Sequence, residues 1–439
     1  MTVRDDLDRH LAAWLTADAP TSPPEHLLGE VLAQTARTRR RPAWRIPERW
    51  IQMSAITSRF ATSPRVPWRL IVVALLTIAL IAGAVLAAGS LRQRVPPPFG
   101  PAANGAIYYS VDGDLMTADS PTGIPRTILG GNTDDSGPLL SPDGTRMVFV
   151  RGAIGSKDAQ LWTAASDGTA PRKLVDVPTI GWAEWSPQSD AVAVLLDRSP
   201  SKILFVNTET GAVREIDSGL AAVQNLIWRP PDGAQLTLRG RDAKTTQWGV
   251  YLIDRDGTGL QRLDLDRGFQ DDPTYDDDWD YYFQGPTWSA DGTRLLYYHA
   301  EPDPGSPAGP GYRNHVATID ATGTVTDDRV VEFERSRDDE FAGTWLDNDT
   351  ILYQTVEGPE HRLLVGSVAA GAGSARDLGI SANDWIPMIV SPDTTTAIVS
   401  LPTTDPAVRE IRSVDLATGA STPTEIGADD ISWQRLAKP

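Results

Sequence analysis

Cysteine is absent from the 439-residue sequence, and histidine occurs only five times. Without thiols, the chain cannot form disulfides, cysteine-ligated zinc sites or thiol nucleophiles. The sequence also lacks a phosphate-binding Walker loop, a G-x-S-x-G nucleophile elbow and an H-E-x-x-H zinc motif. Its C-terminal histidines, His299, His315 and His361, are scattered. We therefore expect no enzymatic activity and no cofactor.

Basic residues are scarce after residue 69. The whole chain has a net charge of −18, but residues 1–69 carry +4, which leaves −22 for the remainder. Because phosphate contacts require lysine and arginine, this acidic part excludes nucleic acid as a partner. It is kept soluble by self-repulsion, and it can attract cations or basic partners.

Charged residues are missing altogether from residues 70–89, LIVVALLTIALIAGAVLAAG, in which Thr77 is the only hydroxyl. A helix of this length extends ~30 Å, which matches the hydrocarbon core of a bilayer. A secretory signal peptide would be shorter and would lie nearer the N-terminus. The run therefore predicts a single transmembrane helix.

The charges on either side of this run predict its orientation. Residues 37–69 contain nine arginines and one acidic residue, Glu48, whereas only Arg92 and Arg94 follow the span before a proline run. Basic flanks remain on the cytoplasmic side of a membrane. We therefore expect residues 1–69 to be cytoplasmic, and the remainder to be extracytoplasmic on a single-pass cell-membrane protein.

The cytoplasmic part contains two short helical patterns, one over residues 3–17 and one after a capping box that begins at Ser22. Together with the basic linker, the span and the outer domain, this layout resembles bacterial membrane-bound anti-sigma factors. The resemblance implies that the helices bind a sigma factor, although the zinc-binding His and Cys pattern is reduced to His26. The alternative is a membrane anchor that has no cytoplasmic partner.

A proline-rich stalk is predicted over residues 90–104, and from residue 105 onward short apolar runs alternate with turn signals, which indicates an all-β fold. The runs repeat, and equivalent positions are spaced by 45, 43, 60, 57, 45 and 43 residues. Four strands per repeat are typical of a β-propeller blade. We expect the recurrent tryptophans to pack between neighbouring blades. The equivalent residues are Leu140, Trp185, Trp228, Trp288, Trp345, Val390 and Trp433.

The two ends of the repeat region complement each other. Residues 431–437 contain only the first strand of a unit, and residues 105–130 contain only the second, third and fourth. Pairing the two segments in one blade would close the ring and remove its open edges. The sequence thus predicts a seven-bladed propeller over residues 105–437.

The turns LSPDG, WSPQSD and WSADG of these units resemble the WD40-like (PD40-type) repeats of the TolB family. The resemblance implies a β-propeller whose blades follow one another along the chain. TolB propellers have six blades, so the alternative is a six-bladed fold in which the Trp345 unit is incomplete.

Loops between second and third strands share one face of a propeller with the links between blades. On that face the predicted loops vary in length, over residues 153–159, 239–248, 301–312 and 334–341. Functional residues concentrate on loops that a rigid scaffold positions. The variable face is therefore the predicted binding face.

The two longest insertions, residues 271–283 and 301–312, flank the Trp288 unit. The first, DDPTYDDDWDYYF, combines six aspartates with five aromatic residues. Such a loop could bind a basic peptide, a sugar amine or Ca²⁺, or it could be solvated surface without a ligand. The predicted ligand-binding residues are Asp276, Asp277, Asp278, Trp279, Asp280 and Tyr281.

Three functions are compatible with these patterns. The first is an extracytoplasmic recognition module for a protein, peptide or glycan. The second is a transmembrane signalling protein of the anti-sigma type, and the third is a propeller hydrolase or lyase. Because function has to be argued from sites and no catalytic motif is present, the sequence favours the first.

Overall fold

The structure is a computed structural model, and residues 93–439 form one compact unit in it. The predicted cytoplasmic helices and the predicted span at residues 70–89 lie outside the described residues. Among the residues that are described, no helix has the length and apolar content that a membrane span requires. The described residues are 95–153, 156–178, 180–196, 202–265, 286–301, 311–331, 339–371, 373–405, 408–427 and 430–438.

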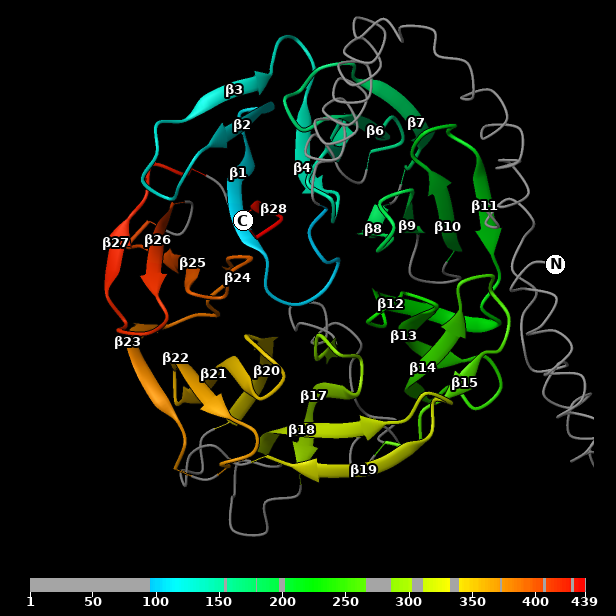
Figure 1. The fold of residues 1–439 in the computed structure, drawn as a ribbon, viewed down its shortest axis with the longest axis vertical. Helices are drawn as coiled ribbons and strands as arrows, with labels where there is room; N and C mark the ends of the chain where they lie inside the picture. The colour runs from blue at the N-terminus through cyan, green and yellow to red at the C-terminus, as the bar shows by residue number, and fades with distance from the viewer. Residues whose placement is uncertain are drawn as a thin grey trace, which may run out of the picture. The chain divides into compact units, whose positions relative to one another are not determined.

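The described part of the chain is all-β and forms seven four-stranded antiparallel sheets, arranged as a ring of blades (Figure 1). Blades 1 to 6 are β4–β7, β8–β11, β12–β15, β16–β19, β20–β23 and β24–β27. The predicted seven-bladed propeller is thus confirmed, and the six-bladed alternative is wrong, because the Trp345 unit is a complete blade, β20–β23.

The strands, in chain order, are β1 (Ala103–Val111), β2 (Asp114–Ala118), β3 (Arg126–Leu129), β4 (Asp135–Leu140), β5 (Arg146–Arg151), β6 (Gln160–Ala165), β7 (Arg172–Asp176), β8 (Ile180–Trp185), β9 (Ala191–Leu196), β10 (Lys202–Asn207), β11 (Val213–Ile216), β12 (Leu220–Trp228), β13 (Gln235–Asp242), β14 (Trp248–Asp254), β15 (Gln261–Arg262), β16 (Thr287–Trp288), β17 (Arg294–Glu301), β18 (Gly311–Ile319), β19 (Val325–Val330), β20 (Asp339–Trp345), β21 (Thr350–Glu357), β22 (Glu360–Ser367), β23 (Arg376–Ala382), β24 (Met388–Val390), β25 (Thr396–Pro402), β26 (Arg409–Asp415), β27 (Ser421–Pro423) and β28 (Ser432–Leu436).

The seventh blade closes the ring from both ends of the described chain, with the strand order β28-β1-β2-β3. β28 pairs antiparallel with β1, and Trp433 lies opposite Ile107. Asp430, just before β28, accepts a hydrogen bond from the Ser110 N–H of β1 (3.1 Å) and one from the Gly137 N–H of β4 (2.8 Å). The C-terminal segment therefore completes its own blade and also joins it to blade 1.

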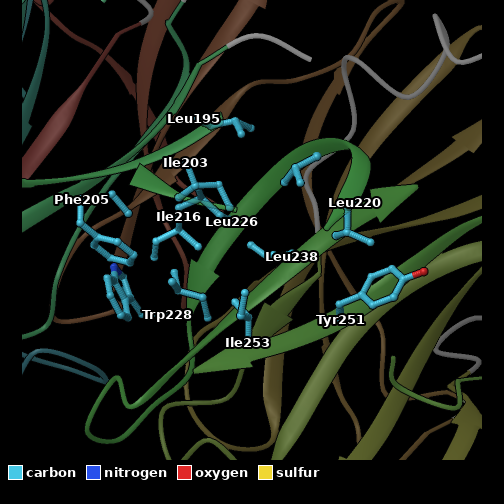
Figure 2. Close-up of a cluster of buried hydrophobic side chains, with 13 residues drawn as sticks. Leu195, Ile203, Phe205, Ile216, Leu220, Leu226, Trp228, Leu238, Tyr251 and Ile253 are labelled. Carbon is cyan, nitrogen blue, oxygen red and sulfur yellow. The ribbon is translucent and has the colours of Figure 1, made fainter. Parts of the chain in front are cut away.

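The core is divided into seven apolar clusters, one between each pair of neighbouring blades. Figure 2 shows the cluster between blades 2 and 3, in which the Phe205 ring of blade 2 lies 5.5 Å from the Trp228 ring of blade 3. Each blade thus presents apolar side chains on both faces of its sheet, and the neighbouring blades cover them. The propeller is held together by the ring as a whole.

The repeated tryptophans lie in these clusters. Trp185, Trp228, Trp288 and Trp433 are at most 8% exposed, and Trp345 is partly buried. The indole N–H of Trp185 donates to the Leu139 carbonyl of the preceding blade (2.9 Å), and that of Trp345 donates to the Thr287 carbonyl (3.1 Å). These indoles therefore combine apolar packing with a polar link between blades.

Arginines connect the turns of successive blades, an arrangement that the sequence pattern does not single out. Arg172 of β7 donates to the carbonyls of Thr208 (2.6 Å) and Glu209 (2.8 Å) in the next blade. Arg214 of β11 donates in the same way to the Asp256 carbonyl of blade 3 (2.8 Å). The planar guanidinium group can reach two carbonyl oxygens at once, which suits it to this role.

Residues 95–102, here called the strap, lie across the ring axis on the face that carries the first-to-second strand turns. Phe99 packs on the cluster between blades 2 and 3, and the Ala102 N–H donates to the Pro392 carbonyl of blade 6 (2.7 Å). Arg435 of β28 donates to the Pro97 carbonyl (3.0 Å). In Figure 1 this blue segment crosses the middle of the ring before it enters β1. The described part of the predicted stalk therefore packs on the propeller.

The same face is here called the turn face, and several of its aspartates accept hydrogen bonds from residues of their own turns. The Asp256 Oδ1 atom accepts hydrogen bonds from the Thr258 N–H (2.9 Å) and hydroxyl (2.6 Å). The pairs Asp167–Thr169 and Asp320–Thr322 repeat this arrangement. In all three turns the pKa of the aspartate is lowered below its ordinary value of 3.8. The hydrogen bond from the threonine hydroxyl has the largest effect, and hydrogen bonds from backbone N–H groups add to it.

These lowered pKa values predict acid lability. A carboxyl group whose pKa is depressed by folding stabilises the native state fully above pH 3.8, and this contribution disappears as the pH falls through the folded-state pKa. We expect the free energy of unfolding to decline below about pH 4. The decline should be smaller in a Thr169→Val/Thr258→Val variant, as measured by urea unfolding at several pH values. Thr326→Val is the control, because the Thr326 hydroxyl donates to a backbone carbonyl and not to a carboxylate. An equal decline in all three proteins would contradict the prediction.

Candidate functional site

The opposite face of the propeller, here called the loop face, carries the second-to-third strand loops and the links between blades. Two loops on it are shorter than predicted. Arg241 still pairs with Trp248 across β13 and β14, so the predicted 239–248 loop is reduced to residues 243–247. Pairing of β20 begins at Asp339, inside the predicted 334–341 loop. In both cases the strand pairing extends further toward the loop face than the turn signals indicate.

The predicted acidic and aromatic insertion at residues 271–283 lies outside the described residues, and so do Asp276, Asp277, Asp278, Trp279, Asp280 and Tyr281. Of the second insertion, Glu301, Gly311 and Tyr312 are described, and they belong to β17 and β18. The structure therefore places the base of the second insertion only.

An aromatic cluster occupies the loop face at this base, between blades 4 and 5. The Phe341 ring of β20 stacks on the Tyr312 ring of β18 at 5.2 Å and meets the Tyr298 ring of β17 edge-on at 5.6 Å. On its other side, Phe341 meets Trp385, in the link between blades 5 and 6, at 5.9 Å and a right angle. Phe341 is buried, whereas Tyr298, Tyr312 and Trp385 are partly exposed. We call these four residues the aromatic platform.

The backbone around Trp385 is held rigidly. The Gln354 side chain donates to the Ile386 carbonyl (2.9 Å) and accepts from the Ile386 N–H (3.1 Å). Arg409 donates to the Trp385 carbonyl (3.1 Å). A link between two blades is thereby anchored to both of them, which keeps the indole in one position. Preorganisation of this kind reduces the entropy cost of binding.

Two buried polar side chains near the platform have no hydrogen-bond partner among the described residues. Asn314 of β18 lies opposite Tyr298 in the strand pairing, is 0% exposed, and leaves both its amide nitrogen and its amide oxygen unpaired. Thr355 of β21 lies opposite Glu340 of β20, is 0% exposed, and leaves its hydroxyl unpaired. An unpaired buried polar group costs about 1–3 kcal/mol. Such groups call for a bound water or ligand as their partner.

A titratable group lies beside the platform. The His361 ring of β22 meets the Trp385 ring edge-on at 6.1 Å. Burial lowers the pKa of His361 below its ordinary value of 6.5, and the nearby Asp384 carboxylate opposes this effect. The imidazole is therefore neutral at physiological pH and extends the platform as an aromatic surface with hydrogen-bonding nitrogens.

Basic side chains gather elsewhere on the loop face, around Trp248 of blade 3. The guanidinium groups of Arg239 and Arg241 lie over the indole, at 5.5 and 5.9 Å from the ring centre. Arg262 of β15 donates to the Trp248 carbonyl (3.2 Å). Three arginines of blade 3 thus surround Trp248, in a domain whose net charge is negative.

Metal coordination has no support in the described ranges, where no three His, Cys, Asp or Glu side chains come close enough together to hold an ion. The predicted Ca²⁺ alternative concerned the 271–283 insertion, so it stays a prediction. The platform offers apolar ring faces, and its neighbours Asn314, Thr355 and His361 add an amide, a hydroxyl and an imidazole. These groups can bind a ligand.

Neither the protein-family models nor the curated proteins include a match to this sequence. Among solved structures, the tricorn protease is 13% identical with a TM-score of 0.52, covering 78% of this chain and 36% of the protease. The chain thus spans little more than a third of the tricorn protease.

The β-propeller domain of the Trilobed protease from Pyrococcus furiosus is 14% identical, with a TM-score of 0.51, over 75% of this chain and 95% of that domain. TolB from Acinetobacter baumannii is 16% identical, with a TM-score of 0.41, over 75% of this chain and 66% of TolB. Prolyl endopeptidases and an oligogalacturonate lyase are also similar. Proteins of this fold therefore include peptidases and a lyase, and the likeness concerns the fold.

Proposed function

We propose that this protein is a membrane-anchored recognition module whose extracytoplasmic propeller binds a protein, peptide or glycan ligand on its loop face. The anchor is the apolar run at residues 70–89, oriented by the nine arginines that precede it. This function requires a rigid scaffold and a prepared surface, and it requires no catalytic group.

The contrast between the two faces of the propeller carries the proposal. On the turn face, Asp167, Asp256 and Asp320 accept hydrogen bonds within their own turns, and arginines bond to carbonyls of the next blade. On the loop face, the aromatic platform is partly exposed, and three buried polar atoms of Asn314 and Thr355 have no partner in the part of the chain that the structure describes. Aromatic surface beside a few positioned polar groups is typical of ligand sites.

The proposal predicts which side chains a ligand needs. Full-length protein in lipid nanodiscs would be screened on glycan and peptide arrays. For any probe that binds, Tyr312→Ala and Trp385→Ala should each weaken binding by at least about tenfold. Each substitution removes an aromatic surface on which the ligand stacks, and this loss costs about 1–3 kcal/mol of binding free energy. Ala417→Ser, in the β26–β27 turn on the opposite face, is the control and should bind normally.

Equal binding by all four proteins would exclude the platform, and binding that is lost with Ala417→Ser would assign the site to the turn face. Two further measurements would test the alternative functions, one on the arrays and one with a sigma factor. Cleavage of an arrayed glycan or peptide would favour a hydrolase or lyase. Capture of a sigma factor by residues 1–69, with no ligand for the propeller, would favour the anti-sigma type.

A further inference from the structure

Two neighbouring residues of an innermost strand form an unusual pair. Trp182 and Glu184 are two positions apart in β8, so their side chains lie on the same face of the strand. Ala183 and Trp185 point to the other face, where they pack between blades 1 and 2. Trp182 and Glu184 therefore face the side of blade 3 and the ring axis. Trp182 keeps 38% of its surface exposed.

Glu184 has a hydrogen bond but no counter-ion among the described residues. The Trp182 indole is a hydrogen-bond partner of its carboxylate. The strands in closest contact with β8 are β9 and β12, and neither contains a charged residue. Burial raises the pKa of Glu184 to about 7, and the hydrogen bond from Trp182 opposes the rise only in part. An ionised carboxylate in such surroundings lacks the positive charge that would stabilise it.

The strap restricts access to this pair. It crosses the axis on the turn face, where Phe99 packs against the cluster that contains Trp228, at the turn-face end of β12. A ligand for the axis would therefore approach from the loop face. It would meet Trp182 first, because β8 runs from the loop face to the turn face and Glu184 is the deeper residue.

We infer that Trp182 and Glu184 form an axial site for an organic cation, namely a primary ammonium or guanidinium group at the end of an alkyl chain, as in a basic peptide side chain. The carboxylate supplies the missing opposite charge, and the exposed indole face attracts the cation through its π system. The net charge of −22 beyond residue 69 draws cations toward the domain. This site is separate from the aromatic platform, so it can exist whether or not the platform binds a ligand.

The test uses the full-length protein in detergent, labelled with 5-fluorotryptophan and observed by ¹⁹F NMR. Trp182→Phe identifies the resonance of Trp182. Addition of n-butylammonium or n-butylguanidinium should shift that resonance saturably, and n-butanol should not. Glu184→Gln should weaken binding at least about tenfold, whereas Glu425→Gln, an exposed residue in the link between β27 and β28, should bind as the unaltered protein does.

The pH dependence provides a second readout. Because the cation requires the ionised carboxylate, affinity should rise with pH through about 7 and then level off. The alkylammonium probe remains charged over this range. Glu184→Gln should abolish the rise while leaving the melting temperature near that of the unaltered protein. Absence of a shift, an equal response to n-butanol, or an unchanged affinity in Glu184→Gln would each overturn the inference.

Discussion

Deletion of residues 431–439 should unfold the entire propeller. The deletion removes β28, bares the edge of β1, and takes Trp433 out of the cluster between blade 6 and the closing blade. It also removes the bond from the Gln434 side chain to the Gly144 carbonyl of blade 1 (2.6 Å). Loss of a buried tryptophan alone costs about 3–5 kcal/mol. With the strand pairing included, the cost should approach the total stability of a domain, about 5–15 kcal/mol.

The measurement is thermal unfolding followed by circular dichroism, with deletion of residues 438–439 as the control. Lys438 is exposed and follows the last strand, so its removal should leave the transition unchanged. A synthetic peptide of residues 430–439 should restore the transition of the longer deletion when added in excess. A truncated protein that melts like the intact one would show that the ring does not depend on β28.

Arg229→Ala should produce the second large effect. The Arg229 side chain, at the end of β12, donates to the carbonyls of Gly292 (3.2 Å), Ile319 (3.0 Å) and Asp320 (2.7 Å), all in blade 4. It also lies over the Trp288 ring at 4.7 Å. The substitution leaves three carbonyls without their donor and opens a cavity against Trp288. We expect the free energy of unfolding to fall by about 3–5 kcal/mol, measured by urea unfolding.

Arg126→Ala is the matched control. Arg126 pairs with Asp119 at 2.6 Å, but both side chains are more than half exposed. Exposed pairs contribute at most about 1 kcal/mol. If the two substitutions cost the same, the buried guanidinium of Arg229 would contribute no more than a surface ion pair. Arg229→Lys should recover only part of the loss, because an ammonium group cannot span three carbonyls in the plane of the guanidinium.

The repeat pattern is sufficient to predict the architecture because each blade is built from the same local pattern of strands and turns. In blade 2, for example, Trp185 ends the first strand, a tight turn follows, and buried apolar residues fill the second and third strands. Incomplete units at the two ends of the region predict the closure that Trp433 and Ile107 display. Loop lengths are less predictable, because strand pairing such as Arg241 with Trp248 continues past the last turn signal.

The candidate site is less accessible to sequence reasoning. The predicted residues Asp276 to Tyr281 lie outside the described residues, and their role stays a prediction. One feature of the sequence could have indicated part of the aromatic platform, because Tyr298 and Tyr312 lie at the two ends of the 301–312 insertion. Phe341 and Trp385 come from later units, and no local pattern connects them with those tyrosines.

The sequence by itself determined that the chain has an apolar run of membrane-spanning length, an acidic part after that run, and a seven-unit all-β repeat closed by its own ends. These are local or periodic properties, and composition and spacing record them directly. Only the tertiary structure decided that Arg229 bonds to blade 4, that the strap crosses the axis, and that Phe341 meets Tyr312 and Trp385. Such contacts join residues of different blades, and they exist only once the ring closes. The packing of one blade on the next decides which residues make these contacts. The periodicity within a single blade does not encode that packing.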